Sequence, residues 1–142
     1  MSVPDYVQHL TERQQGFLPD HLNLEWIEAR PGYIKGRFDV KPHHLAPNTF
    51  LHAASVIALA DSACGYGCII SRPEGAQNFT TIELKSNFLG TTREGGVGVE
   101  ANLVHGGRTT QVWDAVVKAE ATGKTIALFR CTQMLLYPNN KY

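Results

Sequence analysis

One carboxylate and one imidazole stand in an otherwise apolar stretch of the sequence, 50-FLHAASVIALADSACGYGC-68. His52 lies at its start and Asp61 in its middle. Burying a carboxylate costs free energy unless something compensates for it. Asp61 is therefore a candidate nucleophile or general base. The alternative is a structural acid paired with a lysine or an arginine, but nothing on its own helix could pair with it.

The start of the same stretch offers a second chemical group. We expect a helix over about residues 51–70, and the first N–H groups of a helix have no partners within it. They carry a partial positive charge, which suits a carbonyl oxygen that becomes an oxyanion. The backbone amide of Ala53 is the candidate donor.

The distance between these two groups has a consequence for assembly. Ala53 and Asp61 lie roughly 12 Å apart along one helix, so a single carbonyl group cannot touch both. If two copies of this helix run antiparallel across a two-fold axis, the start of one meets the middle of the other. The sequence therefore predicts a site shared between two subunits, with a dimer that is required for activity.

The elements that must position this helix follow from hydrophobic periodicity. Residues 3–18 have helical spacing, with Ser2 as a cap and Pro4 in the first turn. Alternating runs over 22–29 and 33–40 predict a hairpin. The segment 41–50 reads as a loop, and four further strands are expected over residues 79–89, 97–105, 109–119 and 124–137.

Short turns join these strands, so the sheet should be mostly antiparallel. The helix over 51–70 is apolar all round and must be covered all round. One sheet curling about it could do most of that, and a second copy of the protein could finish the job. The predicted fold class is α+β, a single domain over residues 1–142 with its core over about 22–137.

Four segments together resemble a known family: 52-HAASVIALADSACGYG-67, 80-TTIELKSNFLG-90, 105-HGGRTT-110 and 123-GKTIALFRCT-132. They are similar to the hotdog-fold acyl-CoA thioesterases, and the nearest branch is that of the phenylacetyl-CoA and 4-hydroxybenzoyl-CoA thioesterases. The resemblance implies hydrolysis of aromatic or medium-chain acyl-CoA thioesters, with no cofactor and no metal. It also implies a homodimer at minimum, and a homotetramer built as a dimer of dimers.

The resemblance implies roles for individual residues. It makes Asp61 the catalytic carboxylate, with the Ala53 amide polarising the carbonyl and His52 orienting the loop or contacting the thioester. Thr81 would lie near the thioester. Further residues are expected to line the CoA channel or the acyl pocket: Gly65, Tyr66, Phe88, Leu89, Gly90, Gly107, Arg108 and Thr109. In the turn at Gly106-Gly107, glycines let a phosphate approach the backbone and Arg108 can pair with it.

The chain departs from the family pattern at supporting positions. Ala53 and Ala54 replace the two glycines that follow the histidine, although alanine also supplies a backbone N–H. Gly65 stands where a Ser or Thr often follows the acid. Ala46 replaces an Asn or Gln, so that Asn48 is the nearest amide and would serve in catalysis only if the loop shifts.

Composition excludes several classes of function. The 142 residues include 13 basic and 13 acidic ones, which argues against a nucleic-acid binder that relies on counterion release. No signal peptide is visible, and Asp61 interrupts the only stretch that could span a membrane. The odd number of cysteines, without a secreted-domain pattern, favours small core residues in a reducing cytoplasm, at Cys64, Cys68 and Cys131.

Other functions stay open at this stage. A hotdog domain could bind acyl-CoA without cleaving it, although such proteins usually carry an added DNA-binding segment, for which this chain has neither length nor charge. A hydratase of the same fold would generally need an acid and a histidine at a different spacing. A non-hotdog cone that binds a small apolar ligand is the alternative fold. The spacing of His43, His44 and His105 does not indicate a metal site.

Overall fold

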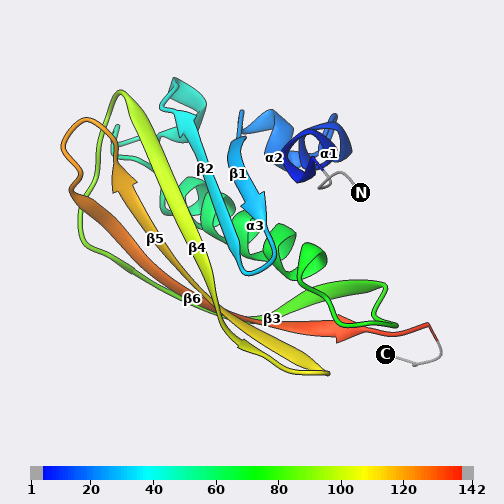
Figure 1. The fold of residues 1–142 in the computed structure, drawn as a ribbon. Helices are drawn as coiled ribbons and strands as arrows, with labels where there is room; N and C mark the ends of the chain where they lie inside the picture. Colours follow the sequence, from blue (N-terminus) through cyan, green and yellow to red (C-terminus); the bar gives the residue numbers. More distant parts are fainter. Residues whose placement is uncertain (1–4, 139–142) are drawn as a thin grey trace.

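An antiparallel sheet wrapped along one long helix makes up the body of the computed structural model, which describes residues 5–138 (Figure 1). The elements are, in order, α1 (Tyr6–Arg13), α2 (Leu18–His21), β1 (Glu25–Arg30), β2 (Tyr33–Asp39), a 3-10 turn (Pro42–His44), α3 (Ala53–Ile70), β3 (Asn78–Phe88), β4 (Gly96–Gly106), β5 (Thr110–Ala119) and β6 (Thr125–Leu136). The predicted α+β class is confirmed. Each of the last four strands begins and ends within one residue of its predicted bounds.

The six strands form one sheet in the order β1-β2-β4-β5-β6-β3, and all neighbours are antiparallel. Helix α3 lies along the concave face of this sheet (Figure 1). Strand β3 follows α3 in the sequence, yet it pairs with β6 at the far edge of the sheet. The chain therefore leaves β1 and β3 as the two edge strands.

Small residues on α3 bring it close to the sheet. Ala60 and Ala63 are fully buried. At Gly67 a Cβ would come within 2.4 Å of the buried Trp113 ring, so only glycine fits this contact. Among the described residues, α3 is also the one helix long and apolar enough to cross a membrane by length and composition, and half of that span is buried inside the fold.

The N-terminal segment differs from the predicted single helix over 3–18. Two short helices are present, because Gly16 adopts a positive φ of 82° after α1 and Pro19 lies in the first turn of α2. The cap of α1 is Asp5, whose side chain accepts a hydrogen bond of 3.0 Å from the amide of Gln8. The predicted cap, Ser2, lies outside the described residues.

A buried glutamine fixes the N-terminal segment to the rest of the fold. The Nε2 of Gln14 donates to the carbonyl of Leu24 at 2.8 Å. Its Oε1 accepts hydrogen bonds from Trp26 Nε1 at 2.8 Å and from Tyr66 OH at 3.1 Å. This network satisfies the indole N–H of a buried tryptophan. Trp26 and Trp113 are core residues, and the three cysteines are buried and free.

Candidate active site

Asp61 lies in the middle of α3, half-buried, and is hydrogen-bonded to strand β3. The Oγ1 of Thr81 donates to its Oδ1 at 3.0 Å. Burial raises the pKa of the Asp61 carboxyl, and the Thr81 hydroxyl offsets only part of this effect. Within residues 5–138, no ion pair involves Asp61. The alternative of a structural acid paired with a cation therefore finds no support in this part of the chain.

The start of α3 presents one free amide. The Nδ1 of His52 accepts a hydrogen bond from the amide of Ala54 at 2.9 Å, and the His52 carbonyl accepts one from the amide of Ser55 at 3.0 Å. In the described part of the chain, the N–H of Ala53 donates to no acceptor, and the residue is exposed. Since the Nδ1 of a neutral His52 acts as an acceptor, its proton is carried on Nε2. His52 thus orients the first turn of the helix around the free Ala53 amide.

A compact loop precedes this helix start. It is closed by a bridge between Leu45 and Leu51 and by a hydrogen bond of 2.8 Å from the amide of Ala46 to the carbonyl of Phe50. Asn48 turns into its own loop, where its Oδ1 accepts a hydrogen bond from the amide of Phe50 at 3.2 Å. Thr49 takes a left-handed φ of 69°, which is uncommon for a β-branched residue. The Asn48 amide oxygen is therefore engaged within its own loop, and its role in catalysis stays a prediction.

His44 fixes the loop over residues 45–51 to the rest of the fold, a role that the sequence did not predict. Its ring is fully buried, with Nδ1 accepting a hydrogen bond from the amide of Lys41 at 2.9 Å and Nε2 lying 2.6 Å from the carbonyl of Leu22. Its own carbonyl accepts hydrogen bonds from His52 N at 3.0 Å and from Ser55 Oγ at 2.9 Å. Burial lowers the pKa of this imidazole. No local pattern signals this role, because all partners except Lys41 are distant in sequence.

The residues predicted to line one CoA channel lie at opposite ends of β6. Phe88 pairs with Ala127, whereas the carbonyl of Thr109 accepts a hydrogen bond of 2.9 Å from the amide of Leu135. This separation is roughly 25 Å along an extended strand. Within one chain, the group Phe88–Gly90 therefore lies far from the group Gly107–Thr109, and their shared role in one channel stays a prediction.

Gly65 lies one helical turn after Asp61 on α3 and packs against β3, whereas Tyr66 faces the N-terminal segment. A Cβ on Gly65 would lie 2.7 Å from the ring of Phe79, so the space that a Ser or Thr would need is filled. The Tyr66 ring packs edge-on against Trp26, with their centroids 5.1 Å apart, and its hydroxyl donates to Gln14. The side chain of Tyr66, which was predicted to line the acyl pocket, thus points toward the N-terminal segment.

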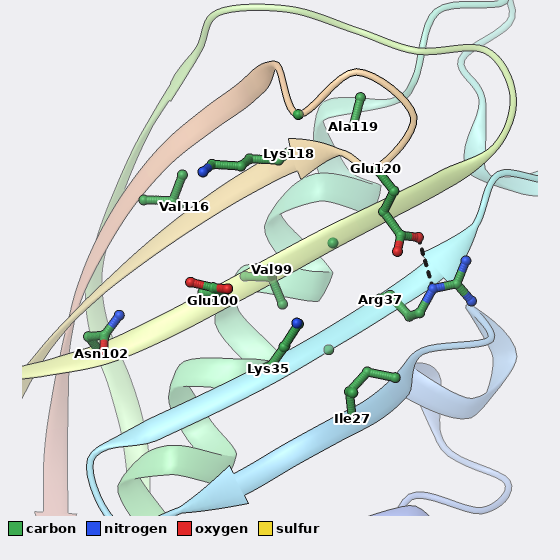
Figure 2. A pocket seen from close by; sticks show the side chains of 13 residues that line it. Ile27, Lys35, Arg37, Val99, Glu100, Asn102, Val116, Lys118, Ala119 and Glu120 are labelled. Carbon is green, nitrogen blue, oxygen red and sulfur yellow. Dashed lines mark hydrogen bonds and ion pairs between the residues drawn. The ribbon is translucent and has the colours of Figure 1, made fainter.

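A separate hollow of about 400 Å³ lies on the opposite face of the sheet (Figure 2). Side chains of Lys35, Glu100 and Lys118 project from neighbouring strands around it, and Arg37 pairs with Glu120 at 2.8 Å on its rim. Helix α3 lies behind the sheet in this view. Neither Asp61 nor Ala53 lines the hollow, so the catalytic groups predicted from the sequence are not there. The described residues contain no group of three potential metal ligands.

Comparison with known proteins assigns the family. Residues 48–126, more than half of the chain, match the thioesterase superfamily. The chain belongs to this superfamily. It is 27% identical to the 1,4-dihydroxy-2-naphthoyl-CoA hydrolase of Listeria monocytogenes over 81% of this chain and 92% of that protein.

Solved structures agree with this assignment. A thioesterase family protein from Silicibacter pomeroyi is 29% identical, with a TM-score of 0.81 over 94% of this chain and 99% of that one. A mutant thioesterase from Pseudomonas aeruginosa is 24% identical, with a TM-score of 0.89 over 96% of this chain and 97% of that one. The hotdog fold is confirmed, and the protein is a thioester hydrolase. The phenylacetyl-CoA and hydroxybenzoyl-CoA branch, the acyl group and the catalytic residues stay predictions.

Proposed function

We propose that this thioesterase superfamily member hydrolyses acyl-CoA thioesters with aromatic or medium-chain acyl groups, using Asp61 as nucleophile or general base. The observation that carries the proposal is the position of Asp61, a half-buried carboxylate on the central helix that meets a hydroxyl and no cation within the described chain. An aromatic acyl group is supported by the Listeria relative, whose name specifies a naphthoyl thioester.

The reaction needs a polarised carbonyl and an attacking oxygen. The Ala53 amide donates a hydrogen bond to the thioester oxygen, on which negative charge develops. Asp61 either attacks the carbonyl carbon to give a transient anhydride or takes a proton from the water that attacks it. In both routes the C–S bond breaks, water supplies the new oxygen, and a carboxylic acid and CoA thiol are released. Thr81 holds the carboxylate through its hydroxyl.

A two-fold dimer through β3 would join the halves of the site. Five exposed apolar side chains on or near this edge favour such an interface: Phe50, Ile82, Leu84, Phe88 and Leu89. Antiparallel pairing of β3 with its copy sets the Phe88 end beside the partner's Asn78 end. Because Asn78 pairs with Leu136, the partner's Thr109 lies next to that end. The same symmetry sets Ala53 of one α3 near Asp61 of the other.

The turn before β5 offers a phosphate contact. The amide of Gly107 donates to the carbonyl of Thr110 at 2.9 Å, and the Tyr137 hydroxyl donates to the carbonyl of Arg108. The turn is thereby held while the Arg108 side chain is exposed. An exposed guanidinium on a turn whose backbone is held in this way suits the phosphates of CoA. We expect the active assembly to be a homotetramer of two such dimers in the cytoplasm.

The test is a panel of phenylacetyl-, benzoyl-, hydroxybenzoyl- and straight-chain acyl-CoA substrates, with free CoA measured by thiol trapping. We expect turnover of the aromatic or medium-chain members and its loss in Asp61→Asn. Asp114→Asn is the matched control, because Asp114 pairs with Arg130 at 2.5 Å on the outer face of the sheet. Full activity of Asp61→Asn would refute the role of Asp61. Tight acyl-CoA binding without hydrolysis by the unaltered protein would favour the non-catalytic alternative.

A further inference from the structure

The hydroxyl of Thr81 lies between two acceptors. Its Oγ1 is 3.0 Å from Asp61 Oδ1 and 2.8 Å from Gln133 Oε1. A threonine hydroxyl has one proton and can donate only one hydrogen bond at a time. The carboxylate of Asp61 and the amide oxygen of Gln133 therefore compete for the same donor.

Gln133 depends on this contact for its hydrogen bonding. Its side chain is fully buried on β6. The other end of the amide lies 3.4 Å from the sulfur of Cys131, which is a weak acceptor. Within residues 5–138, no other side-chain hydrogen bond reaches the Gln133 amide. A buried amide oxygen without a donor is unfavourable, so Gln133 is a strong competitor for the Thr81 proton.

Within residues 5–138, no charged side chain shifts the pKa of Asp61, which burial raises and the Thr81 hydroxyl lowers. Two thiols contribute titratable groups, Cys64 from α3 and Cys131 from β6. The pKa of Cys64 is raised well above its usual value by its contact with Cys131, by burial and by nearby Asp61, so it stays a neutral thiol. The side chains that β2, β4 and β5 bury in the core around α3 carry no charge: Ile34, Phe38, Val97, Val99, Ala101, Gln111, Trp113, Ala115 and Val117. Asp114 and Arg130 pair with each other at the surface.

We propose that Gln133 is a positioning residue that raises the proton affinity of Asp61 by competing with it for the Thr81 hydroxyl. One arrangement satisfies all three side chains in the observed geometry. A protonated Asp61 donates to Thr81, and Thr81 donates to Gln133. With an ionised Asp61, either the carboxylate or the amide oxygen loses its donor. Competition from Gln133 therefore weakens the donation from Thr81 to the carboxylate, and it favours the neutral acid relative to a site without Gln133.

The significance of this arrangement for catalysis rests on the proposed function of Asp61 as the catalytic carboxylate. A general base takes a proton from water in the reaction, and its neutral form must then be accommodated in the site. The Thr81–Gln133 pair accommodates that form, since the new O–H of Asp61 has an acceptor in Thr81. Gln133 thereby makes Asp61 a stronger base without touching the substrate.

The test is a direct titration of the Asp61 carboxyl carbon by 13C NMR in the full-length protein, with the signal assigned from Asp61→Asn. Gln133→Met removes the acceptor and keeps a similar shape, and Gln133→Leu is measured in parallel in case the first variant does not fold. We expect the titration midpoint of Asp61 to fall by about one pH unit, a tenfold change in proton affinity. In a Thr81→Val background the same substitution should leave the midpoint unchanged, because the shared donor is gone.

Gln111→Met is the matched control. Gln111 is also buried and is the register partner of Gln133 across β5 and β6, but it bonds to Trp113 and to the carbonyl of Ser71. Its substitution should not move the Asp61 midpoint. An unchanged or raised midpoint in the Gln133 variants would overturn the inference.

The titration separates this inference from the proposed function. If the midpoint falls but the pH profile of kcat/KM does not follow it, the coupling stands and the catalytic role of Asp61 fails. If Asp61→Asn abolishes turnover while the Gln133 variants leave the midpoint unchanged, the coupling alone fails.

Discussion

Asp61 on α3 and Thr81 on β3 are joined by a hydrogen bond of 3.0 Å between Oδ1 and Oγ1. The hydroxyl is the one side-chain donor that the carboxylate has within the described chain. The net pKa of Asp61 is nevertheless raised, because desolvation outweighs this single hydrogen bond. The acid is thus held in place without being strongly stabilised as an anion, which suits a group that must attack or take a proton.

Thr81→Val removes the donor with little change in shape. We expect kcat/KM to fall about 10- to 100-fold, the value of a hydrogen bond to a charged group. The acid limb of its pH profile should move to higher pH, because the hydroxyl lowers the pKa of Asp61. Thr80→Val is the control, since Thr80 is exposed and alternate residues of a strand face opposite sides. Equal rates for Thr81→Val and the unaltered enzyme would contradict this role.

Asp61→Asn should stabilise the fold near neutral pH. The folded-state pKa of Asp61 is raised, so the folded state binds the proton more tightly than the unfolded chain. The protonated carboxyl therefore contributes its full stabilisation below about pH 4, which is the pKa of aspartate in the unfolded chain. This contribution is lost as pH rises through the higher folded-state pKa. A neutral asparagine avoids this loss, so its Tm advantage should grow with pH in thermal melts. Asp39→Asn should instead lower the Tm near neutral pH, because Arg37 lowers the pKa of Asp39. An Asp61→Asn protein less stable than the parent at neutral pH would contradict the argument.

Ala53→Pro tests the amide donor without deleting a side chain. Proline is favoured at the first helical position and lacks the N–H. The preceding residue, His52, already has φ −66° and ψ 134°, a conformation that proline requires of its neighbour. We expect kcat to fall about 10²- to 10³-fold, as for loss of an oxyanion donor, with an unchanged Tm. Ala53→Gly keeps the N–H and should keep activity; retained turnover in the proline variant would remove the amide from the mechanism.

Mixing the two inactive proteins tests whether the site is shared. A dimer of Ala53→Pro with Asp61→Asn contains one intact site, formed by Ala53 of one chain and Asp61 of the other. In mixed dimers that contain one chain of each kind, one of the two sites is intact, so about half of the normal activity per dimer should return. The measurement is turnover by differently tagged, co-purified dimers. Mixed dimers as inactive as their parents would show that each chain carries its own complete site.

Arg108→Ala should weaken CoA binding alone. Loss of a charge-assisted contact to phosphate should raise KM on the order of 10-fold with kcat unchanged. The effect should shrink at high salt, because the contact is exposed. Arg72→Ala is the control, since Arg72 donates to the carbonyl of Ile69 at the end of α3. A fall in kcat at unchanged KM would assign Arg108 to another role.

Much of the fold could be predicted because its cause is local. Alternating side chains and short turns determine β3 to β6, and the apolar stretch around Asp61 determines α3. Asp61 could also be singled out from one stretch of sequence, because no neighbour on its own helix could pair with it. The N-terminal prediction was wrong because the positive φ at Gly16 breaks a helical pattern that periodicity alone would continue.

Only the tertiary structure decided what surrounds Asp61. Thr81 reaches it, and Gln133 reaches Thr81, because β3 crosses to the far edge of the sheet and pairs with β6 in one register. The same pairing separates Phe88 from Thr109, which the motifs had placed in one channel. Hydrophobic periodicity specifies which face of an element is buried, but strand order and register depend on contacts between residues far apart in the chain. The sequence therefore determined the acid and its helix, whereas the partners of that acid followed from the sheet.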